Sequence, residues 1–315
     1  MSGAPDADAG GGQHAPALLQ AALDALAIRA DGRYLDATYG RGGHAGAILG
    51  RLGKNGSLLA IDRDPDASAA AAGHFGSDSR AEFRQARFSE LSRLVAAGSV
   101  DGILFDLGVS SPQLDDARRG FSFLRDGPLD MRMNPCHGES AAQWLARATG
   151  REIAAVIARF GEERYARRIA RAIVAARAEA PLTTTGGLAS VIATAVPRRQ
   201  PGMHPATRSF QALRIHVNSE LEEIALALPQ AVEALAPGGR LVVISFHSLE
   251  DRIVKRFMRA ASRADPAFAG LPELPPGAQP RLRLVGRAVF ADADEVGRNP
   301  RARSAVLRAA ERLAA

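Results

Sequence analysis

The sequence has a single cysteine, Cys136, among its 315 residues. One thiol cannot form an intramolecular disulfide, and it cannot build a cysteine-rich zinc site. We therefore expect a fold held together by a hydrophobic core, which the 46% hydrophobic content is ample to supply. No metal-binding residues are predicted.

The sequence also lacks a long hydrophobic segment. No run reaches the roughly 18 apolar residues that a membrane-spanning helix needs. Residues 1–13 are rich in Gly, Ala and Asp, without the basic, hydrophobic and cleavage regions of a signal peptide. We expect a cytoplasmic protein with a disordered leader over residues 1–13 and no membrane partner.

Lysine is scarce, so the net charge of +6 comes almost wholly from arginine. The planar guanidinium group suits phosphate contacts better than an ammonium group does, which makes nucleic acid the natural partner. A composition rich in Ala and Arg also follows from high-GC coding. The charge alone therefore leaves nucleic-acid binding and an ordinary basic surface equally open.

Strand and helix patterns alternate over the first third of the chain. The predicted strands cover residues 34–36, 57–62, 81–87 and 100–107. Three of these strands end in an acid, namely Asp36, Asp62 and Asp106. The carboxyl ends of parallel strands meet at one edge of the sheet, where open α/β folds bind ligands. The pattern predicts an α/β fold with three carboxylates along its binding edge.

The first strand leads into a glycine-rich turn, Gly40-Arg41-Gly42-Gly43-His44, and a helix is predicted from about Gly43 to Leu52. Glycines let the backbone approach a ligand closely, and a helix N-terminus offers unpaired N–H groups. The turn satisfies the loose G-x-G-x-x-G/A dinucleotide pattern. NAD, S-adenosylmethionine (SAM) and a turn without a ligand all remain open at this point.

The alternation stops between Asp115 and His216, where only polar loops and helix patterns occur. Ser140 to Gln143 forms a capping box, and Glu152 to Ala178 has the spacing of one long amphipathic helix. We predict an all-helical insertion after the fourth strand. The long helix carries a row of arginines: Arg164, Arg167, Arg168, Arg171 and Arg177. This row is either a solvated face or a phosphate-contacting one.

The α/β pattern then resumes. Ser219 to Glu222 reads as a second capping box, which starts a helix to Ala236 that is predicted to bend at Pro229. The later predictions are a strand over 240–246, a helix over 249–262, a loop over 265–280, and closing strands over 281–287 and 303–308.

Several long segments, taken together and in this order, form a specific pattern that extends from His14 to the end of the chain. They are residues 36–44, 60–65, 101–115, 119–123, 128–133, 204–208, 210–215, 238–251 and 299–304. In these segments the chain resembles the bacterial 16S ribosomal RNA (cytosine-N4) methyltransferases of the cell-division cluster, the MraW or RsmH family.

The resemblance implies a SAM-dependent, Rossmann-like methyltransferase fold with a helical insert after the fourth strand. The methyltransferase domain would cover residues 14–114 and 217–315, and the RNA-recognising insert residues 115–216. It also implies methylation of the exocyclic N4 amine of a cytosine in the decoding centre, at the peptidyl site of 16S ribosomal RNA. The partner would be 16S RNA within the small ribosomal subunit. The oligomeric state stays open, with a homodimer among the alternatives.

Carried over position by position, the resemblance implies a SAM pocket made of Gly42, Gly43, His44, Asp62, Phe88, Asp106 and Gln113. The two glycines would let the backbone approach the methionine end, and Asp62 would accept both ribose hydroxyls. Phe88 would offer its ring to the adenine. Two plainer alternatives remain: Phe88 as a core residue, and His44 contributing only its backbone.

The lone pair of cytosine N4 is delocalised into the ring, so methyl transfer to it depends mainly on positioning. Asp106 is the predicted catalytic residue, as an acceptor for the amine. The residues from Asp106 to Val109 depart from the D/N-P-P-Y/F signature of many amino-methyltransferases. The other acceptor on the substrate side is therefore open among Ser110, Ser111, Asp130 and His247.

Three alternatives compete with this interpretation. A 5-methylcytosine enzyme would attack the ring with a thiolate, and Pro135-Cys136 resembles such a nucleophile, although it lies in a polar loop of the insert. An NAD-dependent oxidoreductase would explain the first strand–helix–strand unit only. A non-catalytic RNA-binding ribosome-assembly factor would share the basic surface.

Overall fold

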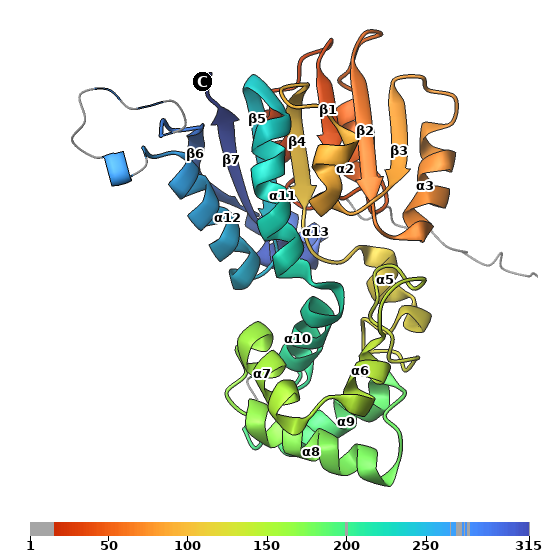
Figure 1. Ribbon diagram of the computed structural model, residues 1–315. Coiled ribbons are helices and arrows are strands. Elements are labelled where there is room, and N and C mark those ends of the chain that lie inside the picture. The colour runs from red at the N-terminus through yellow and green to blue at the C-terminus, as the bar shows by residue number, and fades with distance from the viewer. Residues whose placement is uncertain are drawn as a thin grey trace, which may run out of the picture.

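The computed structural model describes residues 16–198, 201–264, 266–268, 273, 275 and 278–314. The leader predicted over residues 1–13 and half of the loop predicted over 265–280 lie outside the described residues. Figure 1 shows a twisted sheet with helices packed on it and a helical part beyond one end of the strands.

The sheet has seven strands in the order β3-β2-β1-β4-β5-β7-β6. The first five strands run parallel, and β7 is antiparallel to both of its neighbours. Their bounds are β1 Arg33–Asp36, β2 Ser57–Asp62, β3 Ala81–Gln85, β4 Val100–Asp106, β5 Leu235–Ser245, β6 Leu282–Phe290 and β7 Val306–Arg312. The predicted α/β class is confirmed, and β4 lies directly beside β1, so their terminal acids are neighbours.

Apolar side chains cover both faces of the sheet. One face packs against α1 (Leu19–Leu26), α2 (Gly43–Leu49) and α3 (Pro65–Phe75). The other face packs against α4 (Leu91–Leu94), α11 (Glu220–Ala234) and α12 (Ser248–Ala261). Because both faces are buried, the middle strands are nearly continuous hydrophobic runs, as parallel strands usually are. The carboxyl edge is left to carry the polar groups.

Between β4 and α11 the described chain is helical and has a core of its own. The helices are α5 Ser111–Asp115, α6 Ala141–Arg147, α7 Gly150–Gly161, α8 Ala166–Glu179, α9 Thr185–Ala195 and α10 Thr207–Asn218. This part lies beyond the carboxyl ends of β1 to β5, and α10 leads into α11, which packs on the sheet (Figure 1). The predicted capping box of α6 is confirmed, since the Gln143 N–H donates to Ser140 Oγ at 3.2 Å.

The long helix predicted over residues 152–178 is wrong in one respect, because it is two helices. α7 ends at Gly161, and Glu162 adopts a left-handed conformation with φ 49°. A side chain at position 161 would place its Cβ 2.5 Å from the Arg208 carbonyl oxygen. The close approach of α10 therefore demands a glycine where α7 ends, and this contact is absent from any local sequence pattern.

The capping box predicted at Ser219 is also wrong. Ser219 has φ 51° and makes no side-chain capping bond, and its N–H closes the end of α10 on the His216 carbonyl oxygen. α11 starts directly after it and continues through Pro229. After β3, Phe88–Glu90 form a 3₁₀ turn that leads into the short helix α4.

The last three strands are present as predicted, but each is longer than the predicted range. β5 begins at Leu235, five residues before the expected start, and a register shift against β4 accommodates Gly238 at φ 80°. A short helix, α13 (Ala293–Arg298), and a 3₁₀ turn over Pro300–Ser304 connect β6 to β7. Of the helices in the described part of the chain, none combines the length and apolar character needed to cross a membrane.

Candidate active site

Asp36, Asp62 and Asp106 end the adjacent strands β1, β2 and β4 at the carboxyl edge. The register pairs Asp36 with Ala60 on one side and with Leu104 on the other, so the three carboxyl groups follow one edge of the sheet. This concentration of acid is balanced locally by one imidazole, that of His44.

His44 is the second residue of α2 and is buried. Its Nδ1 lies 3.4 Å from Asp106 Oδ2, and the Asp106 N–H donates to Thr38 Oγ1 at 2.6 Å. Burial alone would lower the pKa of His44, but the hydrogen bond and charge of Asp106, with the charge of Asp36, raise it above its ordinary value. The glycine-turn helix and β4 are thus joined by an acid–imidazole pair.

Two atoms of this pair are buried and have no hydrogen-bond partner among the described residues: Asp106 Oδ1 and His44 Nε2. A buried polar atom without a partner costs roughly 1–3 kcal/mol, so such atoms are expected where a ligand will satisfy them. Asp106 Oδ1 is an acceptor, and its natural partner is an N–H or O–H group of a bound molecule.

Asp36 is only 1% exposed, and burial raises its pKa to about 6. One carboxylate oxygen accepts from the Thr38 N–H at 3.0 Å, while Oδ2 has no partner within the described structure. The charge of His44 favours the ionised carboxylate, and the nearby charges of Asp106 and Asp62 oppose it. Asp36 is therefore a buried acid whose pKa, at about 6, lies well above its ordinary value.

Asp62 closes the glycine turn onto the end of β2. Its Oδ2 accepts from the Gly40 N–H at 2.8 Å, and its Oδ1 accepts from the Asp64 N–H at 2.9 Å. Burial raises the pKa of Asp62, while these two N–H groups favour its charged form. A carboxylate has about four acceptor positions, so two remain for hydroxyl groups.

Asp62 also borders a cavity of about 450 Å³, which is within the usual range for small-molecule sites. The residues that line it come from the glycine turn, the β2–α3 connection and α5: Gly40, Arg41, Asp62, Asp64, Asp66, Ala67, Ala70, Ser110, Pro112, Asp115 and Asp116. Five carboxyl groups and one guanidinium are in this lining, but the carboxyl groups of Asp64, Asp66, Asp115 and Asp116 already pair with arginines. The remaining carboxyl group, that of Asp62, suits a ligand with hydroxyl groups, such as the ribose of a sulfonium cofactor.

Gly42 and Gly43 have a structural reason to lack side chains. At Gly42, with φ 76°, a Cβ would lie 2.5 Å from the Tyr39 hydroxyl; at Gly43 it would lie 2.3 Å from Pro16 Cγ. The turn is thus packed against the N-terminal segment on one side. The role predicted for these glycines, a close backbone approach to a cofactor, stays a prediction.

Phe88 is half-buried and packs edge-on against Phe105 of β4, with ring centroids 5.7 Å apart. It starts the 3₁₀ turn after β3, beside the same edge. Both alternatives considered from the sequence are compatible with this position, because one part of the ring contacts the core and the remainder is open.

The sequence did not predict the network that holds Gln113. The side chain of Gln113 is buried; its Nε2 donates to Asp64 Oδ2 at 2.7 Å and its Oε1 accepts from the Ser110 N–H at 3.0 Å. Arg119 pairs with Asp64 at 2.9 Å and with Asp66 at 2.8 Å. Gln113 thus fixes α5 against α3, and the cavity wall depends on it.

The four candidates for a second acceptor are placed differently. Ser110 lines the cavity. Ser111 Oγ accepts from Arg301, and Asp130 forms an ion pair with Arg132 at 2.7 Å. Burial would raise the pKa of Asp130, but the hydrogen bonds from Arg132 lower it overall.

His247 caps α12, and its Nε2 lies 3.2 Å from Glu250 Oε1. Glu250 and Glu220 are both buried and lie close enough to His247 to share an ion. Arg214, however, already binds both oxygens of Glu220, at 2.8 and 2.7 Å. The guanidinium supplies the positive charge that this cluster needs, and it links α10 to the start of α11.

Cys136 is exposed, and its N–H donates to Asn134 Oδ1 in the loop before α6. No strand of the described sheet ends there. The thiol is therefore part of the helical region and not of the acidic edge.

With this geometry established, comparison with known proteins identifies the family. The model of the MraW methylase family matches residues 11–313. The chain belongs to the MraW methylase family. It is 58% identical over 300 residues to ribosomal RNA small subunit methyltransferase H of Xanthomonas oryzae pv. oryzae (strain PXO99A), covering 95% of this chain and 89% of that protein.

Two further members of this family show the same similarity. The methyltransferase H of Thioalkalivibrio sulfidiphilus is 58% identical, with 96% of this chain and 98% of that protein covered. That of Thiobacillus denitrificans is 59% identical, with 96% and 97% covered. The SAM-dependent, Rossmann-like methyltransferase fold and the SAM cofactor expected from the sequence agree with membership of this methylase family.

The solved structures that the chain matches at lower similarity include an rRNA methylase from Streptococcus thermophilus, with 11% identity, a TM-score of 0.42, and 94% of this chain and 95% of that chain covered. Another is a methyltransferase from Streptococcus mutans in complex with SAH, with 11% identity, a TM-score of 0.42, and 94% and 97% covered.

Proposed function

We propose that this protein transfers the methyl group of SAM to the exocyclic N4 amine of a cytosine in the decoding centre, at the peptidyl site of 16S ribosomal RNA. The protein is a SAM-dependent methyltransferase of small-subunit ribosomal RNA. The choice of N4, the position in the RNA, the assembled small subunit as substrate and the cytoplasmic location are parts of the proposal.

The observation that supports the N4 chemistry best is the state of Asp106. Its Oδ1 is buried and without a partner in the described structure, while its Oδ2 faces His44 at 3.4 Å. One oxygen is thus held in place, and the other is available to accept an N–H bond of the target amine. As the methyl transfers, positive charge develops on N4, and a fixed carboxylate stabilises this charge more in the transition state than in the ground state.

Asp62 and the glycine turn are proposed to hold the cofactor, which supplies an electrophilic methyl group when bound. The two free acceptor positions of Asp62 would receive the ribose hydroxyls, beside the cavity that Gly40 and Ser110 also line. Phe88 would contact the adenine, and Gln113 would act indirectly, since both ends of its amide are used to hold α5 and α3 together. His44 would hold Asp106 in position.

Residues 14–114 and 217–315 are proposed as the catalytic domain, and residues 115–216 as the RNA-recognising insert. On α8 and the turn before it, Arg164, Arg167, Arg168 and Arg171 are all exposed. Arg177 is not part of this face, because its guanidinium donates to the Leu145 carbonyl oxygen within the insert. We propose that these four exposed arginines contact RNA phosphates, which is one of the two alternatives considered from the sequence.

The decisive experiment uses labelled SAM and small ribosomal subunits from cells that lack this activity, followed by nucleoside analysis. The expected product is N4-methylcytidine at one site. Subunits from cells that retain the activity are the matched control and should accept no label, since the site is already methylated. Labelled 5-methylcytidine would contradict the amine mechanism, and absence of any label would contradict the proposed substrate.

A further inference from the structure

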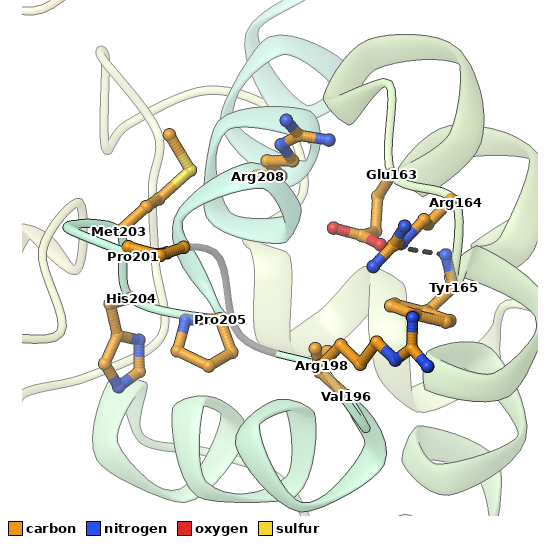
Figure 2. A pocket seen from close by; sticks show the side chains of 10 residues that line it. All are labelled: Glu163, Arg164, Tyr165, Val196, Arg198, Pro201, Met203, His204, Pro205 and Arg208. Carbon is orange, nitrogen blue, oxygen red and sulfur yellow. Dashed lines mark hydrogen bonds between the residues drawn. The ribbon is translucent and has the colours of Figure 1, made fainter.

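A second cavity, of about 400 Å³, lies within the helical insert (Figure 2). Its wall combines the turn between α7 and α8 with the segments that end α9 and start α10. Arg164, Arg198 and Arg208 bring three guanidinium groups to it, and the only carboxylate in the described lining is that of Glu163. The two cavities therefore differ in their charged lining, which is mainly arginine here and mainly aspartate at the site proposed for SAM.

Glu163 is largely committed to the local fold. It is buried, and its Oε1 accepts from the Tyr165 N–H at 2.8 Å, a bond drawn in Figure 2. Arg164 lies over the Tyr165 ring, 4.6 Å from its centroid, which holds this guanidinium at the cavity. Both Arg164 and Arg198 are exposed. The cavity therefore keeps an excess of positive charge that solvent and ligands can reach.

Two helix N-termini add to this charge. α8, of 14 residues, follows Tyr165, and α10, of 12 residues, follows Ala206. Neither has a side-chain capping bond or an acid in its first turn. The N–H groups of Ala166 and Thr207 already donate to the carbonyl groups of Glu163 and His204. The helix dipole nevertheless makes such termini attractive to anions, and phosphate is the usual ligand. Both termini border the same cavity, which also contains the three arginines.

The cavity is connected to the carboxyl edge of the sheet through Glu162. Ser248 Oγ donates to Glu162 Oε2 at 3.1 Å, and Arg252 pairs with Glu162 Oε1 at 3.2 Å, both from the first turns of α12. Arg208, on the cavity wall, donates to the Glu162 carbonyl oxygen at 3.2 Å. A ligand in the cavity would thus lie close to Glu162, whose side chain contacts α12, the helix that follows β5.

We propose that this cavity is a nucleotide subsite, which binds a backbone phosphate of single-stranded ribosomal RNA close to the methylated base. The inference rests on the proposed function, because it takes ribosomal RNA as the substrate. Arg164 and Arg198 bind the phosphate oxygens, with the dipoles of α8 and α10 adding to the positive potential. The side chains of Val196, Met203 and Pro205 provide an apolar wall for the attached sugar and base. Such a contact fixes the register of the RNA and carries no sequence information by itself.

The test is the double variant Arg164→Ala/Arg198→Ala, with Arg151→Ala as the matched control. Arg151 is also an exposed arginine of the insert, but it lies at the opposite end of α7 from the cavity, about 16 Å away along the helix axis. Loss of the charge-assisted phosphate contact should raise the KM for small subunits by about tenfold or more. The kcat and the Kd for SAM should stay at wild-type values.

A direct binding titration of the same variants against unmethylated small subunits, at several salt concentrations, does not depend on turnover. The double variant should lose about 0.7 in the slope of log K against log salt for each single-strand phosphate contact removed. A protein with Arg164→Ala and Arg198→Lys should bind subunits more tightly than the double alanine variant, because the lysine restores the charge at position 198.

If the double variant binds and turns over like Arg151→Ala, with the same salt slope, the subsite is refuted. If the wild-type protein binds subunits but methylates none of them, the proposed function is refuted instead. The binding titration would still show whether the arginines of the cavity contribute to RNA affinity. Thermal melts of each variant confirm that the comparison is made between folded proteins.

Discussion

His44 Nδ1 and Asp106 Oδ2 lie 3.4 Å apart, and this contact joins the helix after the glycine turn to the end of β4. The imidazole has its second nitrogen buried, so the pair is shielded from water on the side of α2. The charge of Asp106 favours the charged form of His44. The contact holds the carboxyl group of Asp106 in position, and the first prediction follows from this.

Asp106→Asn should lower kcat by roughly 10² to 10³, the scale of other electrostatic deletions in active sites. The substitution keeps the shape of the side chain but removes its charge and replaces one acceptor with a donor. The affinity for SAM should change less. Single-turnover methyl transfer at saturating SAM, with a separate SAM titration, measures both quantities.

Asp101→Asn is the control for this experiment, since Asp101 lies at the opposite end of β4 and pairs with the exposed Arg29. It should leave kcat unchanged. If Asp106→Asn regains full turnover once SAM is saturating, Asp106 is a cofactor ligand only and another group orients the amine.

Asp36→Asn should change how the stability of the cofactor-free protein depends on pH. The folded-state pKa of Asp36 is raised from 3.8 to about 6, so the buried carboxyl favours folding fully below pH 4. This contribution is lost as the pH rises from about 4 to about 6, and the shift corresponds to about 3 kcal/mol. The Asn variant stays neutral throughout and should lack this fall.

Urea unfolding at a series of pH values from 4 to 8 measures the effect as the free energy of unfolding. Above pH 7 the variant should be the more stable protein, because it does not bury a charge there. Parallel curves for wild type and variant would show that Asp36 does not titrate in this range.

Asp62→Ala should weaken SAM binding by roughly 1 to 3 kcal/mol, the cost of leaving hydrogen-bonding groups without a partner. Asp62 also accepts the Gly40 and Asp64 N–H groups, so Asp62→Asn serves as a milder variant that keeps one acceptor. Isothermal titration calorimetry should place its affinity between those of wild type and Asp62→Ala. Tight binding of NADH by the wild type, or unchanged SAM affinity in the Ala variant, would overturn the assignment.

Cys136→Ser should retain full activity, because transfer to an amine needs no covalent adduct with the base. The thiol is exposed in a loop of the insert, so the substitution should leave stability unchanged as well. Turnover is measured on unmethylated small subunits, with circular dichroism to confirm folding. A folded variant without turnover would favour attack of a thiolate on the cytosine ring.

The sequence predicted the acidic edge well because each part of it is local. Asp36, Asp62 and Asp106 follow apolar strands, and a parallel sheet brings strand ends together without further information. The helical insertion was also visible, since periodicity changes from strand to helix after residue 115.

What the sequence could not show depends on contacts between distant segments. At the break after α7, Gly161 is required because a Cβ there would lie 2.5 Å from the Arg208 carbonyl oxygen. The Gln113–Asp64–Arg119 network joins three segments, none of which has a distinctive pattern. The raised pKa of Asp36 comes from complete burial, and the sequence gives no sign that this acid is less exposed than Asp62 or Asp106.

The exposed arginines of α8 give the last prediction. Arg167 and Arg171 are four residues apart, so they project from the same face of the helix, and both are exposed. Arg167→Gln/Arg171→Gln should raise the KM for ribosomal RNA and leave the SAM affinity unchanged, because phosphate contacts of this kind release counterions. The slope of log K against log salt should fall by about 0.7 to 0.9 for each lost contact. Arg177→Gln is the contrasting variant: its guanidinium holds the Leu145 carbonyl, so it should lower the melting temperature and spare the salt slope. An unchanged KM and salt slope in the double variant would mean that this face of α8 is solvated and does not touch RNA.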